Sequence, residues 1–256
     1  MRGIQMRNRE WPQFQWEGHV EGLPLTQIQE ALPGWLQAMS EIVGPWRDTS
    51  DVWVYVSKNR LEFCRRIGHV GQNAWVVGTA PHTSRGKPGR VEFLTPSQWE
   101  LHDSDSFAGY FIHELTHVWQ HHHGAHTAPV WWLEGLANLV AWHIRPDDMG
   151  NVQRASEQYR ATLVSQKRIH HLDQMALGLR GFVRRKGYRY PYQWNYGAGM
   201  AVLHTLSAGG LQAVLRQWEQ GSGVPRAIAA TLNQSWSSLG TIPGPLVTEG
   251  GSAHGT

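Results

Sequence analysis

The first hundred residues combine helical and strand-like spacing of their hydrophobic positions. Residues 24–44 predict an amphipathic helix, because apolar side chains recur every three or four positions: Ile28, Leu32, Leu36, Met39 and Ile42/Val43. Short apolar or alternating runs predict strands over 51–56, 74–80 and 90–94, with a helix over 58–67 and a Pro/Gly/Ser/Lys loop over 81–89. This part of the chain therefore predicts a small β-sheet with two helices beside it.

Beyond residue 100 the spacing becomes helical. A helix is expected over 105–122, and a second over 129–146, where Pro129 and Pro146 mark its limits. Further helices are expected near 150–166, 193–207, 209–219 and 223–232, and the Gly/Pro/Ser/Thr-rich residues 241–256 predict a disordered tail. The pattern predicts an α+β fold, in which a small N-terminal mixed sheet precedes a mainly helical body and residues 1–240 form a single domain.

Composition narrows the class of protein. Hydrophobic residues make up 41% of the chain and the formal net charge is +3, as in ordinary globular proteins. Cys64 is the single cysteine, which excludes an internal disulfide and a multi-cysteine metal site. No run approaches the roughly 18 apolar residues of a membrane span, and the N-terminus lacks the apolar core of a secretory signal. We expect no membrane span and a cytoplasmic protein, or a secreted one if the N-terminus is truncated; the oligomeric state stays unknown.

The pentapeptide His113-Glu114-Leu115-Thr116-His117 carries the candidate chemistry. On a helix, positions four apart project from the same face, so both imidazoles reach one metal ion. Glu114 flanks this pair, close enough to touch a metal-bound water without being a ligand. A catalytic zinc ion takes three protein ligands and keeps one position for water, so the motif requires a third ligand from elsewhere.

Two residues compete to be that third ligand. Glu134 lies on the next predicted helix, where an antiparallel return of the chain would bring it beside the histidines, and Asn138 follows one turn later as a hydrogen-bond partner for a ligand imidazole. His123 is the alternative, but Gln120 stands where a glycine is needed to break the helix and turn that histidine inward. Glu134 is favoured, and residues 120–123 are expected to be a solvated helix end.

These motifs resemble the gluzincin zinc metallopeptidases, in particular the peptidase MA-like and basic-secretory-protein-like groups. Residues 113–120 and 134–137 match the HE-T-H-VWQ and EG-A helices of those groups. The similarity is looser over 190–240, where residues 196–206 resemble the helix after the active site. The resemblance implies a zincin-like active-site helix and a Zn²⁺ ion held by His113, His117 and Glu134. It also implies peptide hydrolysis with Glu114 as general base and Tyr196 as oxyanion donor, with three competitors for the latter role: Tyr188, Tyr190 and Tyr192.

One position departs from the family pattern. Thermolysin-like and basic-secretory-type gluzincins have an aspartate where this chain has Asn138, and changes among residues that orient metal ligands cost about 10–100-fold in affinity or activity. The edge strand that would hold a peptide substrate is expected at Asn73, Ala74 and Trp75. The Gly-x-Met-Glu-Asn run of the aminopeptidases is absent from the sequence, which favours an endopeptidase.

Two other classes of function remain as alternatives. A catalytically weak or silent, zinc-stabilised module that binds peptides or proteins is favoured by Asn138 and opposed by the intact Glu114. Nucleic-acid binding would use a cluster of basic and aromatic residues, namely Arg180, Phe182, Arg184, Arg185, Lys186, Tyr188, Arg189 and Tyr190. A solvated basic loop at the rim of a groove explains that cluster better, so no nucleic-acid partner is expected.

Overall fold

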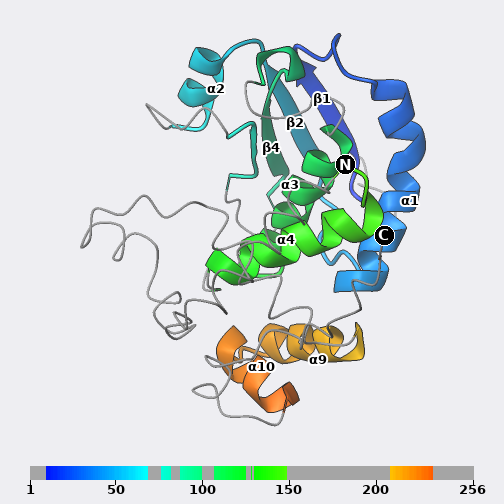
Figure 1. Ribbon diagram of the computed structural model, residues 1–256, viewed down its shortest axis with the longest axis vertical. Coiled ribbons are helices and arrows are strands. Elements are labelled where there is room, and N and C mark those ends of the chain that lie inside the picture. Colours follow the sequence, from blue (N-terminus) through cyan, green and yellow to red (C-terminus); the bar gives the residue numbers. More distant parts are fainter. Residues whose placement is uncertain are drawn as a thin grey trace, which may run out of the picture. The chain divides into compact units, whose positions relative to one another are not determined.

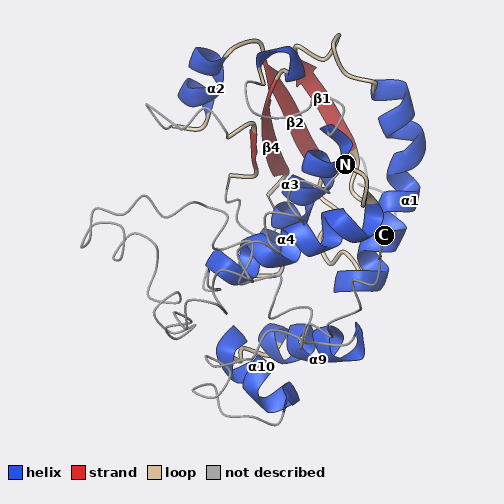
Figure 2. Cartoon of the chain, viewed as in Figure 1, coloured by secondary structure: helices blue, strands red, loops and turns tan. Residues whose placement is uncertain are grey.

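The computed structural model of the chain describes residues 10–68, 76–81, 87–99, 107–124, 128, 130–148 and 208–232. The elements in chain order are β1 (Phe14–Gly18), α1 (Leu25–Val43), β2 (Val52–Ser57), α2 (Arg60–Arg66), β3 (Gly78–Thr79), β4 (Gly89–Leu94), the 3₁₀ turn η1 (Pro96–Gln98), α3 (Phe107–His122), α4 (Val130–Ile144), α9 (Ala208–Glu219) and α10 (Val224–Leu232). Figure 2 shows the strands gathered in one sheet with helices beside it, and the strands precede the run of helices that begins with α3. The predicted α+β class is confirmed.

Contacts divide the chain into two compact units. The first consists of residues 1–127 and 139–150, and the second of residues 128–138 and 151–256. Helix α4 runs without interruption across this boundary. The single-domain prediction over 1–240 stays a prediction. Across the described ranges, no helix combines the length and apolar character that a membrane crossing requires.

The sheet has the strand order β1-β2-β4-β3, of which Figure 1 labels β1, β2 and β4, lying side by side. Strands β1, β2 and β4 are parallel, whereas β3 pairs with β4 in the antiparallel direction and forms an edge. The predicted mixed sheet is thereby confirmed. The sequence analysis missed β1, although apolar Phe14 and Trp16 alternate there with Gln15 and Glu17, which is the spacing of a half-buried strand.

One face of the sheet packs against α3. Neighbouring side chains in register, such as Val54 beside Val91 and Val56 beside Phe93, are all buried on this face. The Phe93 ring lies 4.9 Å from that of Phe107 and 6.3 Å from that of Phe111, measured between centroids. Burial of these aromatic and branched side chains is the main favourable term in the stability of the first unit.

Helix α3 approaches the sheet closely enough to require a glycine. A Cβ atom at Gly89, at the start of β4, would lie 2.6 Å from Cγ1 of Val118 and 3.1 Å from a methyl carbon of Val52. Any side chain there would force helix and strand apart. The absence of a side chain at Gly89 thus lets α3 lie directly on the strands.

Helices α1 and α3 differ in how much of their surface is buried. Helix α1 buries Ile28, Leu32, Leu36, Met39 and Val43, as the spacing predicts. Helix α3 buries side chains around most of its circumference, including the polar Thr116 and Gln120. A helix buried on nearly all sides belongs to the centre of a fold rather than to its surface.

Apart from residues 128 and 130–138, which include the first part of α4, the described part of the second unit is a pair of helices, α9 and α10. Their buried side chains are apolar, namely Leu211, Val214, Leu215, Trp218, Val224, Ala227 and Ile228. The Nε2 atom of Gln217 donates a hydrogen bond of 3.3 Å to Oγ1 of Thr231 and links the two helices. Both helices were predicted within a residue of their observed limits, whereas the helices expected over 150–166 and 193–207 lie outside the described residues.

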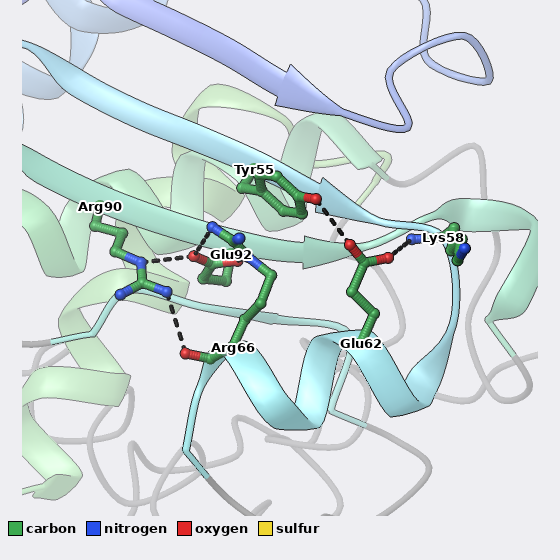
Figure 3. Close-up of polar contacts among 6 residues, drawn as sticks. All are labelled: Tyr55, Lys58, Glu62, Arg66, Arg90 and Glu92. Carbon is green, nitrogen blue, oxygen red and sulfur yellow. Dashed lines mark hydrogen bonds and ion pairs between the residues drawn. The ribbon is translucent and has the colours of Figure 1, made fainter.

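An ion-pair network fixes α2 to the other face of the sheet (Figure 3). Two nitrogens of Arg66 donate to the carboxylate of Glu92 at 2.6 and 2.9 Å, and Nε of Arg90 donates to the same carboxylate at 2.6 Å. The Glu92 side chain has no exposed surface, so its charge depends on both arginines. The Arg66 guanidinium also lies 3.3 Å from the centroid of the Tyr55 ring.

Tyr55 extends this network to the start of α2. Its hydroxyl donates to Oε1 of Glu62 at 2.7 Å, and this hydrogen bond raises the pKa of Tyr55 and lowers the pKa of Glu62. The backbone N–H of Glu62 donates in turn to the side chain of Asn59, which caps the helix. The short helix α2 is therefore held at its first turn by a cap and at its last turn by Arg66.

Replacing Glu92 with glutamine is expected to lower the free energy of unfolding by about 1–3 kcal/mol, because it leaves two guanidinium groups without a carboxylate. Urea denaturation followed by circular dichroism measures this change. Glu17→Gln is the matched control, since Glu17 is exposed on β1 and should change stability by less than about 0.5 kcal/mol. An equal loss in both variants would contradict the structural role of the network.

His122, near the end of α3, is a second buried polar group of the first unit. It is 2% exposed, and its ring meets the Trp46 indole edge-on at 6.4 Å between centroids. Burial lowers the pKa of His122, and the carboxylate of Asp48 and the nearby backbone of Asp48 and Lys87 offset this only in part. Both ring nitrogens of His122 are buried, and neither makes a hydrogen bond among the described residues. The nearby backbone groups therefore do not reach hydrogen-bond geometry.

We expect stability to fall as the pH drops below about 6.5, since there the unfolded chain binds a proton at His122 that the folded chain resists. Above that pH His122 is neutral in both the folded and the unfolded chain, so it no longer lowers the stability. His122→Gln should flatten the dependence of the unfolding free energy on pH between about 5 and 7. His19→Gln, at a half-exposed side chain, should keep the wild-type slope. An unchanged slope in His122→Gln would rule out His122 as its source.

Candidate metal centre

The two histidines of the pentapeptide lie one turn apart on α3. Their Nε2 atoms are 3.1 Å apart, and their rings are nearly perpendicular at 84°. Two nitrogen ligands at about 2.0–2.1 Å from a tetrahedral ion are about 3.3 Å apart, so this spacing suits a shared metal ion. His113 is 8% exposed and His117 is partly buried, which places both side chains away from bulk water.

Glu134 on α4 joins this pair. One ligand atom from each of His113, His117 and Glu134 lies within 4.8 Å of the other two. In the part of the chain that the structure describes, no other group of three histidine, cysteine or acidic side chains comes together in this way. Two imidazoles and one carboxylate form the donor set that zinc accepts in catalytic sites with an open fourth position. The residues present therefore fit a zinc ion.

His123, the alternative third ligand, lies elsewhere. Its ring stacks on that of Trp119 with 4.0 Å between centroids, and its backbone N–H continues the hydrogen bonding of α3 to the carbonyl of Trp119. The helix is thus not broken at Gln120, and the histidine is not turned towards the ligand pair. The described geometry favours Glu134 over His123.

Glu114 lies against the edge strand of the sheet. It is 7% exposed, and a Cβ atom built on Gly78 of β3 would lie 3.2 Å from its Cγ. The same Cβ atom would lie 2.5 Å from Cε1 of Phe93. The backbone of β3 therefore passes next to the carboxylate predicted to be the general base, and only glycine allows this approach.

Gln120 is a site residue that the sequence analysis misjudged. Residues 120–123 were expected to be a solvated helix end, but Gln120 has no exposed surface and His122 is 2% exposed, so that expectation was wrong. Oε1 of Gln120 lies 2.8 Å from Nδ1 of His117. Residues three apart on a helix lie on the same face, so the sequence spacing of His117 and Gln120 was the signal that could have predicted this contact.

Asn138 makes a different contact from the predicted one. Its Nδ2 atom donates a hydrogen bond of 2.9 Å to the carbonyl oxygen of Glu134, one turn earlier in the same helix. The side chain is 2% exposed. Among the described residues no hydrogen bond joins Asn138 to either imidazole, and its predicted role beside the metal ligands stays a prediction.

Several predicted site residues lie outside the described residues. They are Tyr196 with its competitors Tyr188, Tyr190 and Tyr192, the substrate-strand residues Asn73, Ala74 and Trp75, and the basic cluster from Arg180 to Tyr190. The predicted strand over 74–80 is described only from residue 76, and β3 covers Gly78 and Thr79. The roles expected of these residues remain predictions.

Comparisons of the chain with protein-family models, curated proteins and solved structures found no match. The chemistry of the site is accordingly inferred from its side chains: the cluster of His113, His117 and Glu134, the adjacent Glu114 and the neighbouring edge strand β3.

Gly78→Ala is expected to disturb this site, because its methyl group would overlap the Phe93 ring and touch Glu114. We expect a loss of about 1–3 kcal/mol in unfolding free energy, as for other insertions into packed cores. Gly34→Ala is the matched control: nothing lies within 4 Å of its Cβ position on α1, and the change should stabilise that helix by about 0.5–1 kcal/mol. Equal stability of Gly78→Ala and wild type would show that β3 does not approach α3 this closely.

Proposed function

We propose that this chain is a zinc-dependent peptidase in which His113, His117 and Glu134 hold the metal ion and Glu114 acts as general base. The observation that carries the proposal is the meeting of three potential ligand atoms within 4.8 Å, with Glu114 adjacent to the first ligand in sequence. The Nε2 separation of 3.1 Å supports a shared ion further. The resemblance of both helices to gluzincins points to the same chemistry.

When bound, zinc would supply an acidified water and polarise the carbonyl of the bond to be cleaved. Glu114 would take a proton from that water and deliver it to the leaving amine. Its low exposure favours this role, because a carboxylate shielded from bulk water exchanges its proton with bound groups rather than with solvent. Tyr196 is proposed to donate a hydrogen bond to the oxyanion.

The substrate is proposed to be an extended peptide that pairs with β3. This strand pairs with β4 on one side and is last in the strand order, so within the described residues its other side is an edge. Peptides commonly bind by adding a strand to such an edge. Because β3 passes beside Glu114, a peptide aligned with it would run close to the proposed base. The absence of a Gly-x-Met-Glu-Asn run from the sequence favours cleavage within a chain, as in an endopeptidase.

A second candidate is a zinc-stabilised module that binds peptides with little or no catalysis. The observation in its favour is Asn138, a neutral amide where the related enzymes have an aspartate, with its amide hydrogen-bonded within its own helix. Such a module would hold zinc through the same three ligands and bind peptides through the same edge. A measurement of peptide hydrolysis therefore distinguishes the peptidase from the binding module, whereas a measurement of zinc content does not.

The deciding experiment compares zinc content and peptide hydrolysis in wild type, Glu134→Ala and Glu114→Gln. We expect about one zinc per chain in wild type and in Glu114→Gln, and much less in Glu134→Ala. Hydrolysis of casein or of a quenched peptide library should fall at least about 100-fold in Glu114→Gln, which loses the base and keeps the metal. Glu30→Ala, at an exposed position of α1, is the control and should match wild type in both measurements.

Each other outcome leads to a definite conclusion. Zinc retained in Glu134→Ala would show that another residue is the third ligand, and it would refute the proposed gluzincin site. Hydrolysis retained in Glu114→Gln would refute the role of that residue as the base. Zinc in wild type without hydrolysis would favour the binding module, and no zinc in any variant would refute both candidates.

A further inference from the structure

Gln120 and His117 form a buried pair along one face of α3. Oε1 of the glutamine lies 2.8 Å from Nδ1 of the histidine, a normal hydrogen-bond distance. The glutamine side chain has no exposed surface, so water does not compete for this contact. On its other edge the same imidazole presents Nε2, 3.1 Å from Nε2 of His113.

We propose that Gln120 is a positioning residue that fixes the tautomer and orientation of His117 for metal binding. A carbonyl oxygen only accepts hydrogen bonds, so the proton of the neutral ring must be on Nδ1 when that atom faces Oε1. Nε2 then keeps its lone pair and points towards the ligand cluster. This inference rests on the proposed metal site, and it assigns to Gln120 the part that orienting carboxylates or carbonyls play in other metal sites.

The choice of an amide rather than a carboxylate has a physical consequence. A carboxylate at this buried position would add negative charge and make the imidazole a stronger ligand, but it would bear the desolvation cost of a buried ion. Glutamine orients the ring without that charge. Asn138, whose amide donates to the backbone carbonyl of the proposed ligand residue Glu134, is likewise neutral and buried. We therefore expect the side chain at position 120 to influence the affinity of the site for zinc.

The orientation of the amide is the point on which the inference depends. Were the amide reversed, its NH₂ group would donate to Nδ1, and the proton of the neutral ring would move to Nε2. His117 would then be unable to bind a metal ion through Nε2 without changing its tautomer. The location of one proton on His117 thus decides between the two arrangements.

The test uses nitrogen-15 NMR of the imidazole in the zinc-free full chain, at a pH where the ring is neutral. Wild type is expected to carry the His117 proton on Nδ1. Gln120→Glu keeps an acceptor and should preserve that tautomer, whereas Gln120→Leu removes the acceptor and should lose the preference. Zinc affinity, measured by competition with a chelator, should fall about 10–100-fold in Gln120→Leu and be at least as high as wild type in Gln120→Glu.

Gln37→Leu is the matched control, since Gln37 makes a local hydrogen bond to Glu41 on the exposed side of α1. It should leave the His117 tautomer and zinc affinity unchanged. A wild-type proton on Nε2 would overturn the inference, as would wild-type tautomer and zinc affinity in a folded Gln120→Leu. If the leucine variant does not fold, wild type and Gln120→Glu still decide the tautomer.

Failure of the proposed function can be told apart from failure of this inference. The NMR measurement needs no zinc and no catalysis, so it reports on Gln120 even if the chain hydrolyses nothing. Zinc absent from every variant would refute the metal site and with it the purpose assigned to Gln120. Zinc bound equally by wild type and Gln120→Leu would overturn the inference alone.

Discussion

The close packing of α3 on the parallel strands is the constraint on which the described first unit depends. Branched and aromatic side chains fill the space between helix and sheet, and Gly89 provides the gap that Val118 occupies. A second glycine, Gly78, brings the edge strand against Glu114 in the same way. The candidate site therefore includes α3, the helix that packs most closely on the strands.

Burial of α3 decides how its polar side chains behave. A buried polar group must find a hydrogen-bond partner inside the protein, because water cannot reach it. On this helix the nearest partners are one turn away. Thr116 donates to the carbonyl of Ile112 at 2.9 Å, and Gln120 pairs with His117. The proposed ligand His117 thus has a hydrogen-bond partner on its own helix, whereas the proposed ligand Glu134 comes from α4.

The two faces of the sheet use charge in different ways. On the face of α2, a fully buried carboxylate is compensated by two arginines, and this pairing holds a short helix in place. On the face of α3, the side chains closest to the candidate ligands include the neutral amides Gln120 and Asn138. In the proposed zinc site, an uncharged orienting group such as Gln120 would support the metal less strongly than a carboxylate, which would suit either of the two proposed functions.

Much of this protein follows from local sequence. The three- and four-residue spacing in α1 and α3, the alternation in β2 and the pentapeptide each depend on neighbours a few residues away, and this is why these elements and the candidate ligands His113 and His117 were predicted from local spacing. The third candidate, Glu134, was favoured on the expectation that the next helix returns antiparallel. Strand β1 shows the same alternation as β2, so the same local rule applies to it, although it was not predicted.

Tertiary structure decided what depends on distant residues. The meeting of Glu134 with His113 and His117 requires two helices to come together, and the approach of Gly78 to Glu114 requires an edge strand to lie across α3. The burial of Gln120 and His122 contradicted the polar appearance of their segment, because exposure is set by what packs around a helix and not by the composition of its end. The sequence by itself determined which side chains were able to bind a metal, and the fold determined which of them lie close enough to share one.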